Sequence, residues 1–252
     1  KDLLYIGVSG DGDSASIGIG QLIHAIRRNM DMVYIIENNG VYGLTKGQYS
    51  ATADIGSKKK KGAPNKTQPI DLCALAINLG CTFVARSFSG SKKQLGSLIK
   101  AAMSHKGFAL IDVISPCVTF NNNDESMRSY GYVKENEITL HMTDYIPHFN
   151  PVEEIDVPEG HFRDITLHDG STIRLETISA EHDPESPVAA LTALHNAEND
   201  KKHVTGLLYF DNTKPSLAED LGLVDMPLVD VPDSVLRPGK DMLDKINAAL
   251  HS

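Results

Sequence analysis

The stretch between residues 10 and 48 constrains the fold more than any other part of the chain. An apolar run, Leu3 to Val8, is short enough for a buried strand and leads directly into the glycine turn Gly10-Asp11-Gly12. Apolar residues then recur at helical spacing from Ile17 to Asn29, and a second apolar run, Met32 to Ile36, follows. A strand, a helix and a second strand in this order predict a β-α-β unit.

The β-α-β unit predicts where the polar residues at its strand ends lie. Its crossover is right-handed and its strands are parallel, so Asp11 and Asn39 are expected on the same edge of the sheet, outside the core. A carboxylate, an amide oxygen and a free backbone carbonyl are hard ligands suited to Mg²⁺, which keeps positions for water and phosphate oxygens. The helix N-terminus after Gly12 offers unpaired N–H groups to a diphosphate. With Tyr42-Gly43 downstream, the stretch resembles a thiamine-diphosphate site.

Acidic glycine turns also occur in sites of different kinds, which differ in spacing. An EF-hand needs oxygen side chains at the fifth and twelfth loop positions, where this chain has Ala15 and Leu22. A dinucleotide fingerprint stays possible, because Ala15 is a permitted variant at its last position, although Asn38-Asn39 stands where an acidic ribose ligand is usual. A glycine turn without a ligand does not account for Asp and Asn at both strand ends.

Periodicity beyond this unit predicts the organisation of the chain. Helices are expected over Asp71 to Leu79 and Lys92 to Ser104, and strands over Thr82 to Ala85 and Phe108 to Ile114. Residues 1–120 therefore predict an α/β core with a doubly wound parallel sheet, and residues 121–252 a C-terminal extension packed on the core and on a partner subunit. In that extension we expect a hairpin over Arg163 to Thr177 that turns at His168-Asp169-Gly170, a helix over Pro187 to Glu198, a strand over Val204 to Phe210 and a short amphipathic helix from Asp241.

Composition excludes several classes of protein. A chain of 252 residues with 41% hydrophobic residues can bury a full core, and its net charge of −9 argues against a nucleic-acid surface. No apolar run reaches membrane-spanning length, and three cysteines without paired spacing suggest a reducing cytoplasm. The spacing of His141, His148, His161 and His168 shows no metal pattern, so we expect surface or hairpin histidines.

Several motifs outside the glycine turn are more specific than the turn itself. They are Gly43-Leu44-Thr45-Lys46-Gly47-Gln48, Gly62-Ala63-Pro64-Asn65-Lys66-Thr67, Ala85-Arg86-Ser87-Phe88-Ser89-Gly90, Ser115-Pro116-Cys117-Val118-Thr119-Phe120-Asn121, Leu167-His168-Asp169-Gly170-Ser171 and Thr205-Gly206-Leu207-Leu208-Tyr209. Together these motifs cover most of the chain and resemble the β subunit of 2-oxoacid:ferredoxin oxidoreductases, most of all the two-subunit 2-oxoglutarate type.

The resemblance implies a set of site residues. Asp11 and Asn39 would bind Mg²⁺ together with the carbonyl of Val41. Lys46 would lie beside the diphosphate and the substrate carboxylate as the catalytic cation. The remaining residues implied to line the thiamine diphosphate are Gly10, Gly12, Asp13, Gly43, Leu44 and Thr45.

The cysteines depart from the family pattern. Family members carry a Cys-x-x-Cys pair and a further Cys before the glycine turn, which with Cys117 would hold a [4Fe-4S] cluster. Those upstream residues are missing here, so we expect the chain to be a fragment or an incomplete subunit. A cluster generally takes four thiolates, so Cys117 alone does not hold one. We expect Cys73 and Cys81 to be small buried residues.

The resemblance also implies an activity and partners. It implies oxidative decarboxylation of a 2-oxoacid, with 2-oxoglutarate favoured over pyruvate or branched substrates, transfer of the acyl group to coenzyme A and transfer of electrons to ferredoxin. An α subunit is implied because no residue here is an obvious proton donor to the aminopyrimidine. The alternatives are a thiamine-dependent decarboxylase or carboligase, and a nucleotide-binding or non-catalytic domain. The run Lys58 to Lys61 is either a solvated loop or a contact for coenzyme A phosphates or an acidic ferredoxin.

Overall fold

A six-stranded sheet forms the centre of the protein. The computed structural model describes residues 3–58, 63–149, 162–177, 182–224, 226–237 and 239–250. The strand order is β1-β2-β6-β5-β11-β7, and the first four strands are mutually parallel, whereas β11 runs antiparallel to β5. The sequence predicted an α/β fold with a parallel sheet, and this is confirmed except that the sheet also includes the antiparallel strand β11. Its strands are β1 (Ile6–Gly10), β2 (Met32–Asn38), β5 (Phe83–Phe88), β6 (Phe108–Ile114), β7 (Glu137–Thr139) and β11 (His203–Phe210).

Helices cover both faces of this sheet. Apolar side chains of α1 (Ile19–Arg27), α2 (Leu72–Asn78) and α5 (Pro187–Asn199) share one core cluster with one face of the strands. Helix α3 (Lys92–Met103) buries Leu98, Ala101 and Ala102 against the other face. Two layers of helices around a parallel sheet leave the carboxyl ends of the strands open at one edge.

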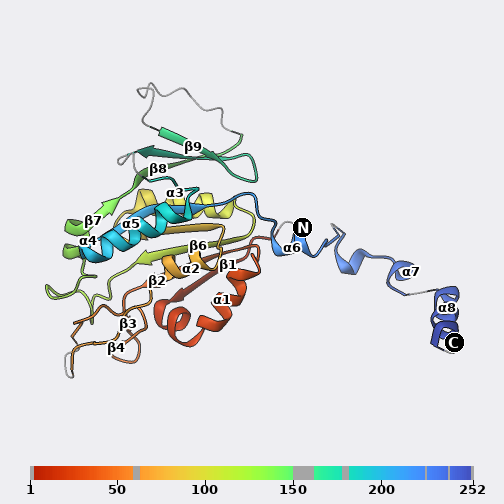
Figure 1. Cartoon of the computed structure of the whole chain (residues 1–252), viewed down its shortest axis with the longest axis horizontal. Coiled ribbons are helices and arrows are strands. Elements are labelled where there is room, and N and C mark those ends of the chain that lie inside the picture. The colour runs from red at the N-terminus through yellow and green to blue at the C-terminus, as the bar shows by residue number, and fades with distance from the viewer. Residues whose placement is uncertain are drawn as a thin grey trace.

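A second, three-stranded sheet packs outside α3. It has the order β8-β10-β9, with β8 (His141–Ile146), β9 (Phe162–Thr166) and β10 (Thr172–Thr177), and Figure 1 shows β8 and β9 on the α3 side of the molecule. The expected hairpin turn lies between β9 and β10, where Gly170 has φ +81° and donates its N–H to the Leu167 carbonyl at 3.0 Å. Ile165, Leu167, Ile173 and Leu175 join the core cluster beneath α3.

His141 contradicts the expectation of a surface histidine. Its side chain is 1% exposed and lies 5.4 Å, ring centre to ring centre, from the buried His182. The reason is strand alternation, because β8 turns His141 and Thr143 inward and Met142 outward. His161 lies outside the described residues.

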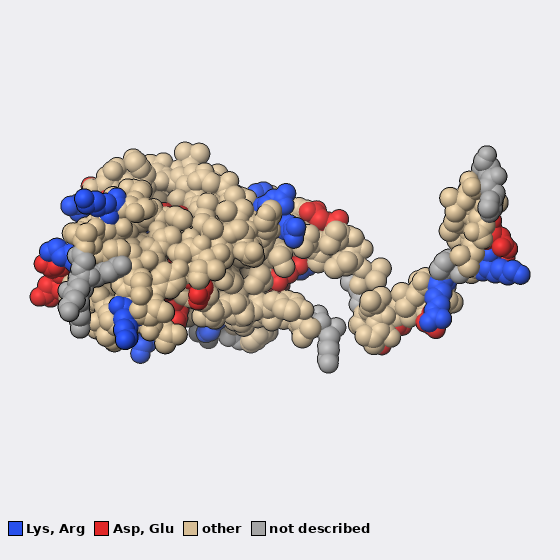
Figure 2. Space-filling model, turned by 90° about the horizontal axis from the view of Figure 1, so that it is seen from below, with Lys and Arg blue, Asp and Glu red and all other residues tan. Residues whose placement is uncertain are grey.

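Residues beyond 120 divide between the core and an extended arm. β7, β11 and α5 belong to the central sheet and its helical layer, so this half of the chain completes the core. The arm contains α6 (Leu217–Asp220), η2 (Leu228–Asp230), α7 (Asp233–Leu236) and α8 (Lys240–Leu250), none of which has a buried residue. Figures 1 and 2 show α7 and α8 lying away from the body. Among the described residues, no helix combines the length and apolar character needed to cross a membrane.

Candidate functional site

The aspartate and the asparagine singled out from the sequence, Asp11 and Asn39, lie together at one edge of the sheet. β1 and β2 are parallel neighbours with Gly10 opposite Glu37, so Asp11 and Asn39 follow strands that end side by side. The N–H of Asn39 donates to Asp11 Oδ1 at 3.3 Å. The expected convergence is therefore present, but Asp11 is 1% exposed and does not lie outside the core as expected. It is buried because the chain after β2 folds back over it.

The Asp11 carboxylate has two unequal oxygens. Oδ2 accepts from the Gly40 N–H at 3.1 Å, from Thr52 Oγ1 at 2.6 Å and from the Ser50 hydroxyl. Among the described residues, Oδ1 accepts one hydrogen bond, a long one of 3.3 Å from the Asn39 N–H. Three donors saturate Oδ2, and Oδ1 is therefore the oxygen with capacity left for a cation.

The neighbouring donor set fits Mg²⁺. Asn39 Oδ1 accepts from the Val41 N–H at 2.9 Å, which holds the amide oxygen in place and leaves it a second lone pair. Among the described residues, no group of three or more His, Cys, Asp or Glu could hold a metal. A cation here would thus take one carboxylate, one amide oxygen and a backbone carbonyl, which is the set of hard oxygens that Mg²⁺ accepts alongside water and phosphate.

The turn after β1 brings backbone close to an aromatic ring. Residues Gly12–Ile17 form a π-helix, η1, which ends where the Gly18 N–H donates to the Asp13 carbonyl at 2.6 Å. A Cβ on Gly12 would lie 2.5 Å from the ring of Tyr42, whose hydroxyl donates to the Gly12 carbonyl at 3.0 Å. Only glycine fits at that position, and the contact ties the first turn to the hairpin that follows Asn39.

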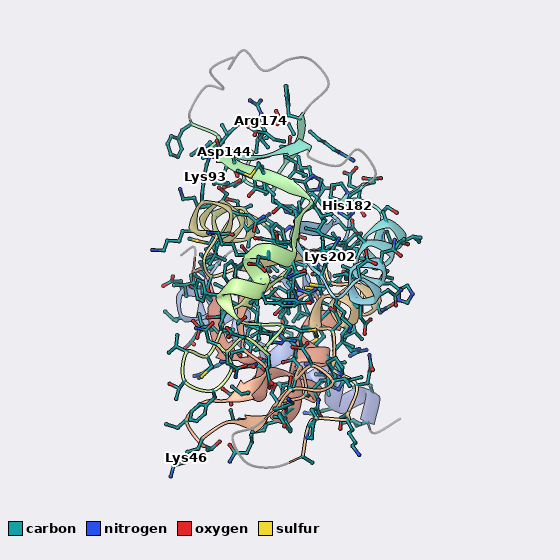
Figure 3. All side chains as sticks on the ribbon, turned by 90° about the vertical axis from the view of Figure 1, so that its left-hand side faces the viewer. Lys46, Lys93, Asp144, Arg174, His182 and Lys202 are labelled. Atoms are coloured by element: carbon teal, nitrogen blue, oxygen red, sulfur yellow. The ribbon has the colours of Figure 1, made fainter. Side chains whose placement is uncertain are left out.

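The residues Gly43, Leu44, Thr45 and Lys46 form the tip of a small hairpin. Its strands are β3 (Val41–Tyr42) and β4 (Gln48–Tyr49), and the Gly47 N–H closes it on the Tyr42 carbonyl at 2.8 Å. Leu44 is 99% exposed, and Lys46 has φ +75° and extends away from the ribbon (Figure 3). The backbone of the tip and the charge of Lys46 are therefore accessible to a ligand or partner that binds at this edge.

Cys117 lies beside the same hairpin. A Cβ on Gly43 would be 3.7 Å from its sulfur, and a Cβ on Gly47 would be 3.0 Å from the ring of Phe120. Cys73 and Cys81 are fully buried in the core, and burial raises the pKa of the Cys81 thiol to about 12. Of the three cysteines, Cys117 is the partly exposed one.

A buried polar network that the sequence did not reveal supports the site. Arg128 is 7% exposed and pairs with Asp54 at 2.9 Å. Burial by itself would lower the pKa of Arg128, but the Asp54 carboxylate outweighs burial and raises that pKa. No spacing pattern in the sequence identifies Arg128 as part of the network, and Ser50 and Thr52 belong to no motif. Asn121 could have been identified, because it is the last residue of the Ser-Pro-Cys motif.

A second buried arginine is linked to Arg128 through three successive hydrogen bonds. Arg86 on β5 pairs with Asp71 and with Asp112 on β6, each at 2.8 Å. Asn38 joins the two arginines, since its Nδ2 donates to Asp112 Oδ1 at 2.9 Å and its Oδ1 accepts from Arg128 at 2.7 Å. Both arginines line a cavity of about 190 Å³ at the ends of β2, β5 and β6. Their charges are already neutralised by carboxylates, so the cavity has no free guanidinium.

Comparison with known proteins gives a consistent result. Residues 2–113 match the family described as thiamine pyrophosphate enzyme, C-terminal TPP binding domain. A 2-oxoacid:ferredoxin oxidoreductase subunit beta from a Sulfolobus species is 52% identical over 48% of this chain and 40% of its own length. The 2-oxoglutarate synthase subunit KorB of Methanocaldococcus jannaschii is 42% identical over 52% of this chain and 51% of its own length.

A solved structure extends the likeness to nearly the whole chain. It is a 2-oxoglutarate:ferredoxin oxidoreductase from Magnetococcus marinus with 2-oxoglutarate, coenzyme A and succinyl-CoA bound. It superposes with a TM-score of 0.63 at 27% identity, over 94% of this chain and 69% of that one. The matched part of this chain thus spans about half or less of the two curated relatives, whereas the fold similarity reaches into the C-terminal half.

Proposed function

We propose that this chain is the cofactor-binding subunit of an enzyme that oxidatively decarboxylates a 2-oxoacid, because residues 2–113 match a thiamine-pyrophosphate-binding domain and part of the chain is similar to subunits of 2-oxoacid oxidoreductases. The observation that carries the proposal is the asymmetry of the Asp11 carboxylate, with one saturated oxygen and one directed at the edge where Asn39 lies. A site built for a diphosphate-bound Mg²⁺ needs such an oxygen.

Different residues of this chain would bind the Mg²⁺ ion and the diphosphate. Asp11 Oδ1, Asn39 Oδ1 and the Val41 carbonyl would hold Mg²⁺, and the backbone around η1 and the hairpin tip would contact the diphosphate. The residues assigned to that contact are Gly10, Gly12, Asp13, Gly43, Leu44 and Thr45. When bound, thiamine diphosphate supplies a nucleophilic carbon and an electron sink for loss of carbon dioxide.

Lys46 would provide positive charge near the reacting anion. Its side chain is exposed, so water screens its charge in the isolated chain. A partner that covers Leu44 and Lys46 would lower the local dielectric and strengthen the attraction of Lys46 for a carboxylate. We therefore assign an α subunit to this edge, and coenzyme A, ferredoxin and the 2-oxoacid as further partners of the complex.

Cys117 is proposed as one thiolate ligand of a [4Fe-4S] cluster. The described residues place no second cysteine beside it, since Cys73 and Cys81 are buried in the core. They do not make a complete cluster site, which needs four ligands. Further ligands would have to come from other parts of the protein or its partner.

We favour 2-oxoglutarate as the substrate because two of the relatives above carry it in their names. Pyruvate and branched 2-oxoacids are the alternatives. The test is an anaerobic assay of the complete complex with each 2-oxoacid, coenzyme A and a low-potential redox dye. Dye reduction that requires both thiamine diphosphate and coenzyme A supports the proposal. Release of carbon dioxide without coenzyme A or dye would instead indicate a simple decarboxylase or carboligase.

A further inference from the structure

The segment that follows Cys117 folds across the loop that carries the metal ligands. Asn121 Nδ2 donates to the carbonyl of Asn39 at 2.7 Å, and Ser126 Oγ fixes the Asn121 amide by donating to its Oδ1 at 2.7 Å. Gly40 has φ +76°, and a Cβ there would lie within 3.3 Å of both Asn121 and Arg128. The close approach requires glycine at residue 40 and fixes the distance between the two segments.

Arg128 makes the central contacts of this crossing. Its Nη1 donates to Asn38 Oδ1 at 2.7 Å, its Nη2 to the Thr52 carbonyl at 2.6 Å and its Nε to Asp54 at 2.9 Å. The guanidinium is planar and remains charged at all accessible pH values, so these three directions are held together as one rigid unit.

These contacts decide where the Thr52 hydroxyl points. Its oxygen lies 2.6 Å from Asp11 Oδ2 and 2.9 Å from Asn38 Oδ1, but the hydroxyl has one proton and can donate to only one of them. Asn38 Oδ1 is a neutral acceptor that already accepts a charge-assisted bond from Arg128, whereas Asp11 Oδ2 belongs to a carboxylate and lies closer to the Thr52 hydroxyl. The Thr52 hydroxyl therefore donates to Asp11 Oδ2, which keeps Asp11 Oδ1 as the oxygen free for a cation.

We propose that Arg128 is a positioning residue of the metal site, which acts through Asn38 and Thr52 to orient the Asp11 carboxylate, and that Asn121 supports it by holding Asn39. This inference rests on the proposed function, since it assumes that Asp11 and Asn39 bind Mg²⁺. It also means that the segment carrying Cys117 and the metal-binding loop form one rigid unit.

The test compares two buried arginines in the assembled complex. Arg128→Lys keeps the positive charge but loses the planar guanidinium that donates in three directions. Arg86→Lys is the matched control, because Arg86 is similarly buried and also pairs with carboxylates. Arg86 does not touch Asn39, Thr52 or Asp11. Calorimetric titration with Mg²⁺ at fixed thiamine diphosphate gives the apparent affinity, and thermal unfolding without cofactor reports stability separately. Outer partners of metal ligands typically contribute 10- to 100-fold to metal affinity, so we expect Arg128→Lys to weaken Mg²⁺ binding at least about tenfold. Arg86→Lys should change it less than about threefold while lowering thermal stability to a similar degree.

A second pair of variants tests whether Arg128 acts on Asp11 through Thr52. This test remains valid even if Arg128→Lys fails to fold. Thr52→Val should weaken Mg²⁺ binding about tenfold, and Thr52→Ser, which keeps the hydroxyl, should not. In a Thr52→Val background, Arg128→Lys should add less than about threefold, because both act on the same oxygen. Equal effects of Arg128→Lys and Arg86→Lys, or of Thr52→Val and Thr52→Ser, would overturn the inference. Mg²⁺-independent cofactor binding by the wild-type complex would instead overturn the proposed function itself.

Discussion

Replacing Asp11 in two ways separates its role in binding from its role in folding. Asp11→Ala removes an acceptor of four hydrogen bonds. The Ser50 and Thr52 hydroxyls lie 3.0 Å apart and can pair with each other, so the N–H groups of Asn39 and Gly40 are the donors left without a partner. At about 1–3 kcal/mol for each of the two donors left without a partner, we expect a loss of roughly 2–6 kcal/mol. At about 2–4 °C per kcal/mol for a chain of this size, that loss lowers Tm by about 4–24 °C.

Asp11→Asn preserves the shape and removes the charge. The new amide can point its oxygen at the three donors that now surround Oδ2, and its NH₂ group then faces the position of the cation. We expect roughly 1–2 kcal/mol of destabilisation, because neutral acceptors form weaker bonds than a carboxylate, and loss of Mg²⁺-dependent cofactor binding.

The assay pairs thermal unfolding of the cofactor-free protein with calorimetric titration of thiamine diphosphate in the presence of Mg²⁺. Undiminished cofactor affinity in Asp11→Asn would refute the assignment of Asp11 as a ligand. An unchanged Tm in Asp11→Ala would refute the hydrogen-bond argument, whatever the binding result.

Three other variants test the remaining assignments. Lys46→Ala should lower turnover with every 2-oxoacid by more than tenfold in a steady-state assay. It should leave Tm unchanged, because the Lys46 side chain is exposed. Lys93→Ala replaces another exposed lysine and should change neither turnover nor Tm. Cys117→Ala should lower the iron content and ferredoxin reduction of the complete complex, whereas Cys73→Ala should leave iron unchanged by colorimetric analysis; equal iron in both variants would argue against ligation. Burial lowers the pKa of His141 from 6.5 to about 4, so the unfolded state takes up the proton first and stability falls as pH drops from about 6.5 towards 4. His141→Leu should flatten that part of the curve of unfolding free energy against pH, measured by denaturant titration, and a curve as steep as that of the wild type would contradict the assignment.

Local patterns in the sequence were enough to predict that Asp11 and Asn39 lie at the same edge of the sheet. Strand length, helical spacing and the right-handed crossover predicted β1, α1 and β2 to within a few residues, and Asp-Gly after Leu167-His168 predicted the hairpin turn. The π-helical start of the helix was not predictable, because it depends on how Tyr42 packs against Gly12.

Burial of the site was harder to predict than its location. Asp11 was expected at an open edge because the sequence does not show that Ser50, Thr52 and Arg128 close over it. Arg128 lies far along the chain from Asp11, and an isolated arginine in a loop has no periodicity or spacing that marks it as buried. Such contacts between distant segments are decided by tertiary packing alone.

The position of β11 between β5 and β7 has a consequence for synthesis of the protein. β5 ends at Phe88, but its outer neighbour begins at His203, so one side of that strand stays uncovered until most of the polypeptide has left the ribosome. Long-range pairings of this kind form slowly, since a long loop must close before the contact is gained. During that interval the unpaired edge of β5 would be accessible to other nascent chains, and chaperone contact with the growing chain would be of greatest value then.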